Sequence, residues 1–172
     1  MDTTIHIREY DPDADLAALR ACVIELQDFE AGLYKRLPPG TEVVDNCVDH
    51  MFEQCEKCNG KIMIAEVNGE VGGFVTVLCT VRSEEPDDGD LMYGLISDLA
   101  VLEKHRSRGI GRQLLEAAEA FARSRDVAWL RIGVLAGNGV AESIYESMGF
   151  SPWYIECEKR LGPPPERQQE VP

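Results

Sequence analysis

The chain has 172 residues, of which 44% are hydrophobic and 28% are charged, and its formal net charge at pH 7 is −14. This length and composition are typical of one soluble globular domain and exclude a disordered or fibrous protein. The acidic charge argues against a nucleic-acid partner, and no apolar run approaches the roughly 18 residues of a membrane span.

The start of the chain is charged rather than apolar. Asp, Glu and Arg occupy six of its first fifteen positions, which argues against the apolar core of a secretory signal. We therefore expect a cytoplasmic protein. Thiols stay reduced in the cytoplasm, so the six cysteines are expected to be free and to lie mostly in the core.

The first half of the chain predicts a strand, two helices and a hairpin. The predicted elements are a strand at 5–10, helices at about 14–33 and 45–57, and strands at 61–67 and 70–82. Asp13 is expected to cap the first helix, and the Pro38-Pro39-Gly40 cluster is expected to separate the two helices. Asn68-Gly69 is a strongly favoured two-residue hairpin turn.

The second half alternates strands and helices after an acidic loop at 83–90. The predicted elements are strands at 95–102, 127–135 and 152–161, a helix at about 109–124 and a short helix at about 141–148. Gly149 is expected to end the short helix. This order predicts one mixed α/β (α+β) domain over residues 1–161 and a flexible tail at 162–172.

A basic, glycine-rich loop, Arg106-Ser107-Arg108-Gly109-Ile110-Gly111, joins a predicted strand to a predicted helix. Residues 103–112 carry a local charge of +3, whereas the rest of the chain carries −17. Free N–H groups at a helix start bind anions, and glycines let a diphosphate approach them. The side chains of Arg106, Arg108 and Arg112 add charge-assisted donors.

Two nucleotide-binding loops do not fit this segment. A Walker loop needs Lys and then Ser or Thr after its last glycine, but Arg112-Gln113 follow Gly111 here. A Rossmann fingerprint needs a third glycine where Leu114 stands. The loop therefore predicts a diphosphate ligand of another kind.

The sequence resembles the GNAT superfamily of N-acetyltransferases from about residue 61 to residue 161. The family motif Arg/Gln-x-x-Gly-x-Gly/Ala is present as Arg106 to Gly111, after the strand phrase Leu99-Ala100-Val101. A second block has Asn138 after a strand, Tyr145 seven residues later, and Glu146 to Phe150 at its end. The resemblance implies a mixed sheet of about six to seven strands, about four flanking helices, and acetyl-CoA as donor.

The resemblance also implies how the donor is bound and used. The expected cofactor-binding residues are Leu99, Ala100, Val101, Arg106, Ser107, Arg108, Gly109, Ile110, Gly111, Arg112, Asn138 and Tyr145. The main chain of 99–101 would contact the pantetheine arm and polarise the thioester carbonyl. The amine would attack directly in a ternary complex, and Tyr145 would protonate the departing sulfur.

The base that deprotonates the amine is less clearly indicated. Many relatives carry Glu-Asp where this chain has Ser97-Asp98, so Ser97 departs from the pattern. Asp98 is either a structural acid or a base acting through water, and strand alternation predicts that it faces away from Ser97. Three acids of the first helix are either an acceptor site or a solvated face: Glu25, Asp28 and Glu30.

Cys47, His50, Cys55 and Cys58 have metal-like spacings. In one helix Cys47 and Cys58 would lie about 16 Å apart, too far for one ion, so no metal is expected. The acceptor is expected to be a primary amine of a small molecule or peptide, and the acidic charge favours a cationic one. A non-catalytic acyl-CoA-binding module and a thiol or metal protein remain alternatives. Dimers are common in the family, and the oligomeric state stays open.

Overall fold

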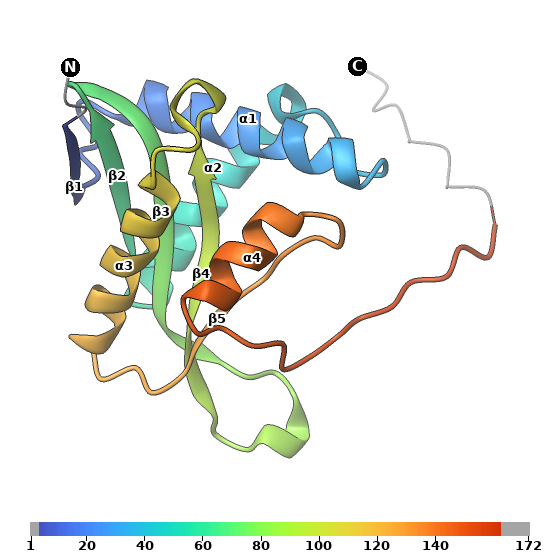
Figure 1. The fold of residues 1–172 in the computed structure, drawn as a ribbon. Helices are drawn as coiled ribbons and strands as arrows, with labels where there is room; N and C mark the ends of the chain where they lie inside the picture. Colours follow the sequence, from blue (N-terminus) through green and yellow to red (C-terminus); the bar gives the residue numbers. More distant parts are fainter. Residues whose placement is uncertain (1–3, 163–172) are drawn as a thin grey trace.

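The computed structural model describes residues 4–162, which form one five-stranded mixed sheet packed between helices (Figure 1). The strands are β1 (Ile5–Glu9), β2 (Lys61–Val67), β3 (Glu70–Arg82), β4 (Met92–Val101) and β5 (Leu130–Ile132). They lie side by side in chain order, antiparallel up to β4, and β5 then runs parallel to β4. The mixed α/β fold expected from the sequence is confirmed.

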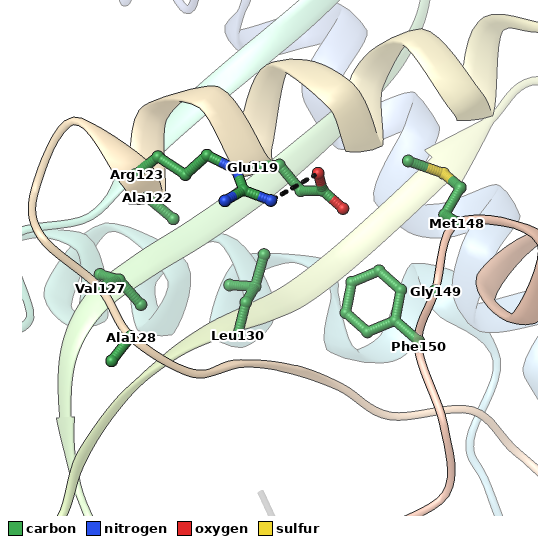
Figure 2. A pocket seen from close by; sticks show the side chains of 9 residues that line it. All are labelled: Glu119, Ala122, Arg123, Val127, Ala128, Leu130, Met148, Gly149 and Phe150. Atoms are coloured by element: carbon green, nitrogen blue, oxygen red, sulfur yellow. Dashed lines mark ion pairs between the residues drawn. The ribbon is translucent and has the colours of Figure 1, made fainter.

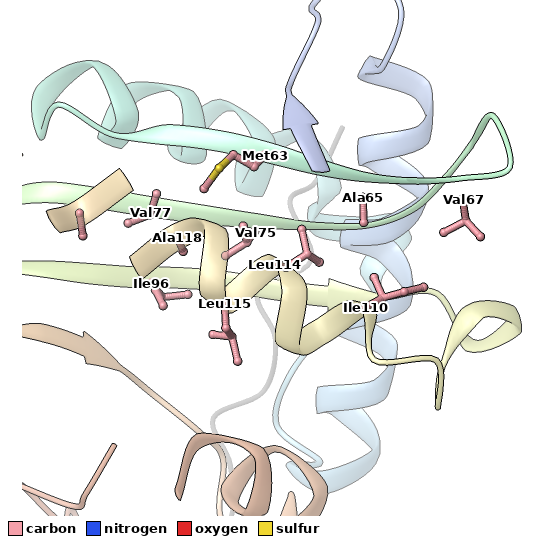
Figure 3. Close-up of a cluster of buried hydrophobic side chains, with 11 residues drawn as sticks. Met63, Ala65, Val67, Val75, Val77, Ile96, Ile110, Leu114, Leu115 and Ala118 are labelled. Atoms are coloured by element: carbon pink, nitrogen blue, oxygen red, sulfur yellow. The ribbon is translucent and has the colours of Figure 1, made fainter. Parts of the chain in front are cut away.

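Four α-helices cover the two faces of the sheet. They are α1 (Leu16–Leu33), α2 (Gly40–Lys57), α3 (Ile110–Arg123) and α4 (Gly139–Ser147), with short 3-10 turns η1 (Pro86–Asp88) and η2 (Glu103–His105). One apolar cluster joins α1 and α2 to the sheet, and a second joins α3 to its other face, with α4 beside it (Figures 1 and 3). Within residues 4–162, none of the helices combines the length and apolar character needed to span a membrane.

The predicted hairpin is present between β2 and β3. Asn68 and Gly69 both have positive φ angles, 52° and 87°. This backbone is the one that a two-residue turn between twisted strands requires, and Asn-Gly adopts it at low cost. The prediction is therefore confirmed together with its physical reason.

Helix α2 begins five residues before the predicted start, at Gly40. Pro39 precedes the helix, and the carboxylate of Asp28 in α1 accepts a hydrogen bond of 2.7 Å from the Gly40 N–H. A Cβ atom at Gly40 would lie only 2.5 Å from the Ile24 carbonyl oxygen. Gly40 is therefore the first residue of α2 and permits the close crossing of α1 and α2. The sequence had predicted that Pro38-Pro39-Gly40 lies wholly between the two helices.

The expected cap of α1 is wrong. The helix begins after Asp15 rather than after Asp13, and the Asp15 side chain makes no capping bond. Instead both Asp15 oxygens accept from the Arg8 guanidinium, at 2.6 and 2.8 Å. Asp15 is buried, so the ion pair joins the start of α1 to β1.

The predicted strand at 152–161 is also wrong, which leaves five strands instead of six to seven. These residues are exposed and join no strand, and the 127–135 prediction contracts to Leu130–Ile132. Side chains connect this segment to the rest of the described residues. The Arg131 guanidinium lies 4.0 Å from the Trp153 ring centre, and the Tyr34 hydroxyl donates to Glu158 at 2.6 Å. Of the predicted tail at 162–172, residues 163–172 lie outside the described residues.

Candidate active site

Strands β4 and β5 pair over only three positions and then leave a cavity between them. The pairs run from Gly94 with Leu130 to Ile96 with Ile132. Beyond them lies a cavity of about 120 Å³, walled by residues 96–99 of β4, the end of β5 and the residues after it (132–135), and parts of α1 and α4. Five predicted site residues line it: Ser97, Asp98, Leu99, Asn138 and Tyr145.

A bulge in β4 shapes the floor of this cavity. Thr76 pairs with Asp98 but the next β3 residue pairs with Ile96, so Ser97 has no partner in the ladder. Such a bulge breaks strand alternation and re-aims side chains. The Ser97 hydroxyl donates to the Asp98 carboxylate at 2.7 Å. The Ser97 and Asp98 side chains therefore lie together at the cavity. The prediction that strand alternation turns them to opposite sides is wrong.

Three ionisable groups meet at the cavity without a basic side chain among them. They are Asp98, Glu30 of α1 and Tyr145 of α4. Burial raises the pKa of Asp98, and this rise is partly offset by the hydrogen bond from Ser97 and by nearby His50. Burial and the charge of Asp98 raise the pKa of Glu30, and burial and Glu30 raise the pKa of Tyr145. The tyrosine thus keeps its proton at neutral pH.

The glycine-rich loop leads into α3 as predicted. Helix α3 begins at Ile110, and Gly109 before it has a φ of 76°, a left-handed conformation that favours glycine. At Gly109 a Cβ atom would have nothing within 4 Å, so this side of the loop is open, whereas at Gly111 it would contact Val101 at 3.8 Å. Unpaired N–H groups at the start of a 14-residue helix and an open approach fit a diphosphate.

The two arginines of the loop and Arg112 in the first turn of α3 are held in different directions. Arg106 donates to the Val101 carbonyl and to Glu25 of α1, both at 3.0 Å. Arg108 donates to the Lys104 carbonyl at 3.2 Å, and Arg112 donates to Ser147 of α4 at 2.8 Å. The predicted phosphate-binding group Arg106 therefore faces α1, which the sequence did not indicate.

The other residues predicted to contact acetyl-CoA lie at different places in the fold. Asn138 is the N-cap of α4, and its side chain accepts from the Ala141 N–H at 3.3 Å. Ala100 is buried in the cluster under α1 and α2, and Ile110 is buried in the cluster under α3. Ser107 is exposed with a φ of 61°. Only Leu99 of the 99–101 phrase lines the cavity.

The cysteine and histidine residues of α2 do not form a common site. Within residues 4–162, no group of three or more His, Cys, Asp or Glu side chains is arranged to hold a metal ion. Burial raises the pKa of Cys55 to about 11 and also raises that of Cys47. Raised pKa values keep these thiols protonated, so they are poor nucleophiles.

A second, larger cavity lies away from these residues. It has a volume of about 220 Å³ and lies between the end of α3 and the end of α4, where Figure 2 shows mainly apolar side chains. Its one ion pair is Arg123 with Glu119, at 3.8 Å within α3. None of the predicted site residues lines it. Its larger volume does not make this cavity the better candidate for the active site. Its acidic residue, Glu119, is paired with Arg123, and the cavity lies at the ends of two helices and not at a helix start.

The chain is similar to known acetyltransferases in sequence and in fold. A family model described as an acetyltransferase (GNAT) domain matches residues 58–152, just over half of the chain. The chain is similar to an uncharacterized N-acetyltransferase of Bacillus subtilis (strain 168), YhfO, with 34% identity over 89 residues, or 52% of this chain and 57% of YhfO.

Similarity also extends to streptothricin acetyltransferase of Streptomyces lavendulae, with 32% identity over 84 residues, or 49% of this chain and 40% of that protein. These matches span between about a quarter and just over half of the curated relatives' lengths. Among solved structures, the aminoglycoside N-acetyltransferase AAC(6')-Iy in complex with CoA matches with a TM-score of 0.67 and 16% identity, covering 94% of this chain and 97% of that one. That likeness concerns the fold.

Proposed function

Because the chain belongs to the GNAT acetyltransferase family, we propose that it transfers the acetyl group of acetyl-CoA directly to a primary amine in a ternary complex, as a single domain over residues 1–161. One observation carries the proposal. The cavity between β4 and β5 brings Ser97, Asp98 and Tyr145 together, from segments far apart in the sequence. The glycine-rich loop follows the same β4 strand directly.

The donor would be held along β4 and at the start of α3. The free N–H groups of α3 and the open approach at Gly109 suit the pyrophosphate. Arg108 and Arg112 are exposed and can add charge-assisted bonds. Residues 97–99 line the cavity, and we expect their main chain to bind the pantetheine arm and the thioester carbonyl.

The proton transfers follow from the cavity residues. As the amine nitrogen bonds to the acetyl carbon, the carbon–sulfur bond breaks, and a proton must leave nitrogen and another must reach sulfur. Tyr145 stays protonated because burial and Glu30 raise its pKa, so it can donate to the departing thiolate. Asp98, directly or through water, takes the proton of the attacking amine.

A cationic acceptor is favoured by the carboxylates of Glu30 and Asp98. Both line the small cavity, and neither takes part in a salt bridge among residues 4–162, although His50 lies near enough to Asp98 to oppose the rise of its pKa. The buried Asp15, by contrast, is paired with Arg8. Unpaired carboxylates in a partly buried cavity are stabilised by an incoming ammonium group. Two of the similar proteins are named for streptothricin and aminoglycosides, which supports a small-molecule amine.

The test is the release of CoA thiol from acetyl-CoA over a panel of diamines, aminoglycosides and lysine peptides. We expect turnover with cationic amines, and Tyr145→Phe should lower kcat roughly 10²-fold, within the range of acid–base effects. The exposed Tyr154 provides the matched control, Tyr154→Phe, which should keep full activity. Binding of acetyl-CoA without turnover of any amine would favour the binding module, and absence of binding would overturn both readings.

A further inference from the structure

Glu25 of α1 contacts the glycine-rich loop region at two points. Its Oε1 atom accepts from the Glu103 N–H at 2.6 Å and from Arg106 Nη2 at 3.0 Å. Glu103 begins the 3-10 turn before the loop, and Arg106 is the first residue of the loop motif. The Glu25 carboxylate therefore binds both the turn before the loop and the side chain of Arg106, the first residue of the loop.

Arg106 is fixed by more than this ion pair. Its Nε atom donates to the Val101 carbonyl at the end of β4, at 3.0 Å. Its guanidinium also lies over the ring of Phe29, 5.5 Å from the ring centre. Glu25 and Phe29 are one helical turn apart, so Arg106 lies against one stripe of α1. The side chain links the end of β4, the loop and α1.

The same helix forms a wall of the catalytic cavity. Leu26 follows Glu25 and Glu30 follows Phe29, and both Leu26 and Glu30 line the cavity opposite Ser97 and Asp98. A movement of α1 at Glu25 thus changes where Glu30 lies. The loop is linked to the other wall as well, because Arg112 donates to Ser147 at 2.8 Å, two residues after Tyr145.

We propose that Glu25 and Arg106 are positioning residues that couple the donor loop to the acceptor wall. Donor binding orders the loop, and the Arg106–Glu25 link then holds α1, and with it Glu30, in the position that receives the amine. This inference rests on the proposed function of the loop. Coupling of this kind is reciprocal, so each ligand tightens the binding of the other, typically by about 5- to 150-fold.

A purely structural role fits the pair less well. The Arg106 and Glu25 side chains are 43% and 36% exposed, and ion pairs at such sites add about 0 to 1 kcal/mol to stability. Loss of the pair should therefore leave the fold intact. The effect of a substitution should instead be seen in the response of α1 to the donor.

The test uses the full chain with CoA as the probe and amide hydrogen exchange as the readout. In the wild type, CoA should protect both the start of α3 and the Glu25–Glu30 turn of α1. In Glu25→Ala, protection of α3 should remain and protection of α1 should be lost, with an unchanged melting temperature. Glu25→Gln, which keeps an acceptor oxygen but no charge, should retain part of the α1 protection.

The matched control is Glu70→Gln. Lys104 pairs with Glu70 at 2.9 Å, so this ion pair also ties the loop region to the body of the protein, but it reaches β3 and not α1. The control should keep α1 protection. With an amine identified by the acetylation panel, Glu25→Ala should raise the KM for the amine about tenfold and change kcat much less.

The outcomes separate the two proposals. If CoA binds and protects α3 but leaves α1 unprotected in the wild type, the coupling is overturned while the proposed function stands. Equal loss of α1 protection in Glu25→Ala and Glu70→Gln also overturns it, because the link would then not be specific to α1. If the wild type does not bind CoA, both proposals fail.

Discussion

Three acidic residues of α1 that look alike in the sequence lie in three different environments. Glu25 binds the loop through Arg106 and the Glu103 N–H. Asp28 accepts from the first N–H of α2. Glu30 lines the cavity between β4 and β5, as does Asp98. Helical spacing predicts which residues share a face, but it does not say which neighbour each one meets, so the sequence could not separate them.

Replacing Glu30 with Gln should stabilise the protein at neutral pH. Burial and Asp98 raise the pKa of Glu30 above its ordinary value of 4.5, so the ionised carboxylate destabilises the folded state. The stabilising effect of Glu30→Gln should be present at pH 7 and disappear as the pH falls below 4.5. Thermal melts at pH 7 and in acid measure it, with the exposed Glu116→Gln as control.

The same variant should bind a cationic amine more weakly. We expect the KM for the amine to rise roughly tenfold, because a charge-assisted bond is worth about 1.5 to 3 kcal/mol. Binding of acetyl-CoA should be unchanged. Higher stability without any loss of amine affinity would contradict the assignment of Glu30 to the acceptor.

Asp15 should have the opposite pH dependence. The hydrogen bonds from Arg8 lower the pKa of this carboxyl below its ordinary value of 3.8. Its contribution to stability is therefore fully present above pH 3.8 and is lost as the pH falls through the lower, folded-state value. Asp15→Asn should lower the free energy of unfolding by about 2 kcal/mol at pH 7, within the range for hydrogen bonds to a charged group, measured by urea denaturation.

The exposed Arg20–Asp45 pair provides the control for Asp15. The Asp45 side chain is 76% exposed, and such pairs contribute about 0 to 1 kcal/mol. Asp45→Asn should therefore shift the urea midpoint only slightly. Equal effects of the two variants would show that burial of Asp15 does not strengthen its ion pair.

At the scale of elements, two glycines next to the α1–α2 turn should respond in opposite ways to alanine. Gly40→Ala would place a Cβ atom 2.5 Å from the Ile24 carbonyl oxygen and should destabilise the protein by about 1 to 3 kcal/mol. Gly32→Ala, in α1 with nothing within 4 Å, should stabilise it by about 0.5 to 1 kcal/mol. Chemical denaturation of both variants decides this, and a neutral Gly40→Ala would contradict the close crossing.

Elements specified by local chemistry were predicted well, and elements specified by contacts were not. The Asn68-Gly69 hairpin and the α3 helix after Gly109 follow from turn residues and helical spacing, and both are confirmed. The start of α2 depends on a carboxylate from another helix. The 152–161 segment has strand-like residues, but a strand also needs a hydrogen-bonding neighbour, and the residue pattern cannot show that one exists.

At the scale of the whole molecule, the sequence offers clearer candidates for the proposed donor side of the site than for the proposed acceptor side. The loop motif, Asn138 and Tyr145 lie in contiguous blocks, whereas the acceptor wall comes from α1, on the opposite face of the sheet from α3. Loop residues were predicted correctly as a strand-to-helix connection. The direction of Arg106 and the partnership of Ser97 with Asp98 depend on tertiary contacts and a bulge that spacing does not reveal.

The charge of the loop differs in sign from that of the rest of the chain, and this has a consequence for the speed of donor capture. An approaching polyanion first meets a molecule of net charge −14 and meets the +3 loop region only near contact. Added salt screens this repulsion at shorter distances, because the Debye length of the solution falls from about 30 Å at 0.01 M salt to about 10 Å at 0.1 M. The association rate of acetyl-CoA should therefore rise over this range, the reverse of ordinary electrostatic steering. Stopped-flow binding would measure it, and a rate that falls steadily from the lowest salt would mean that the loop alone governs the encounter.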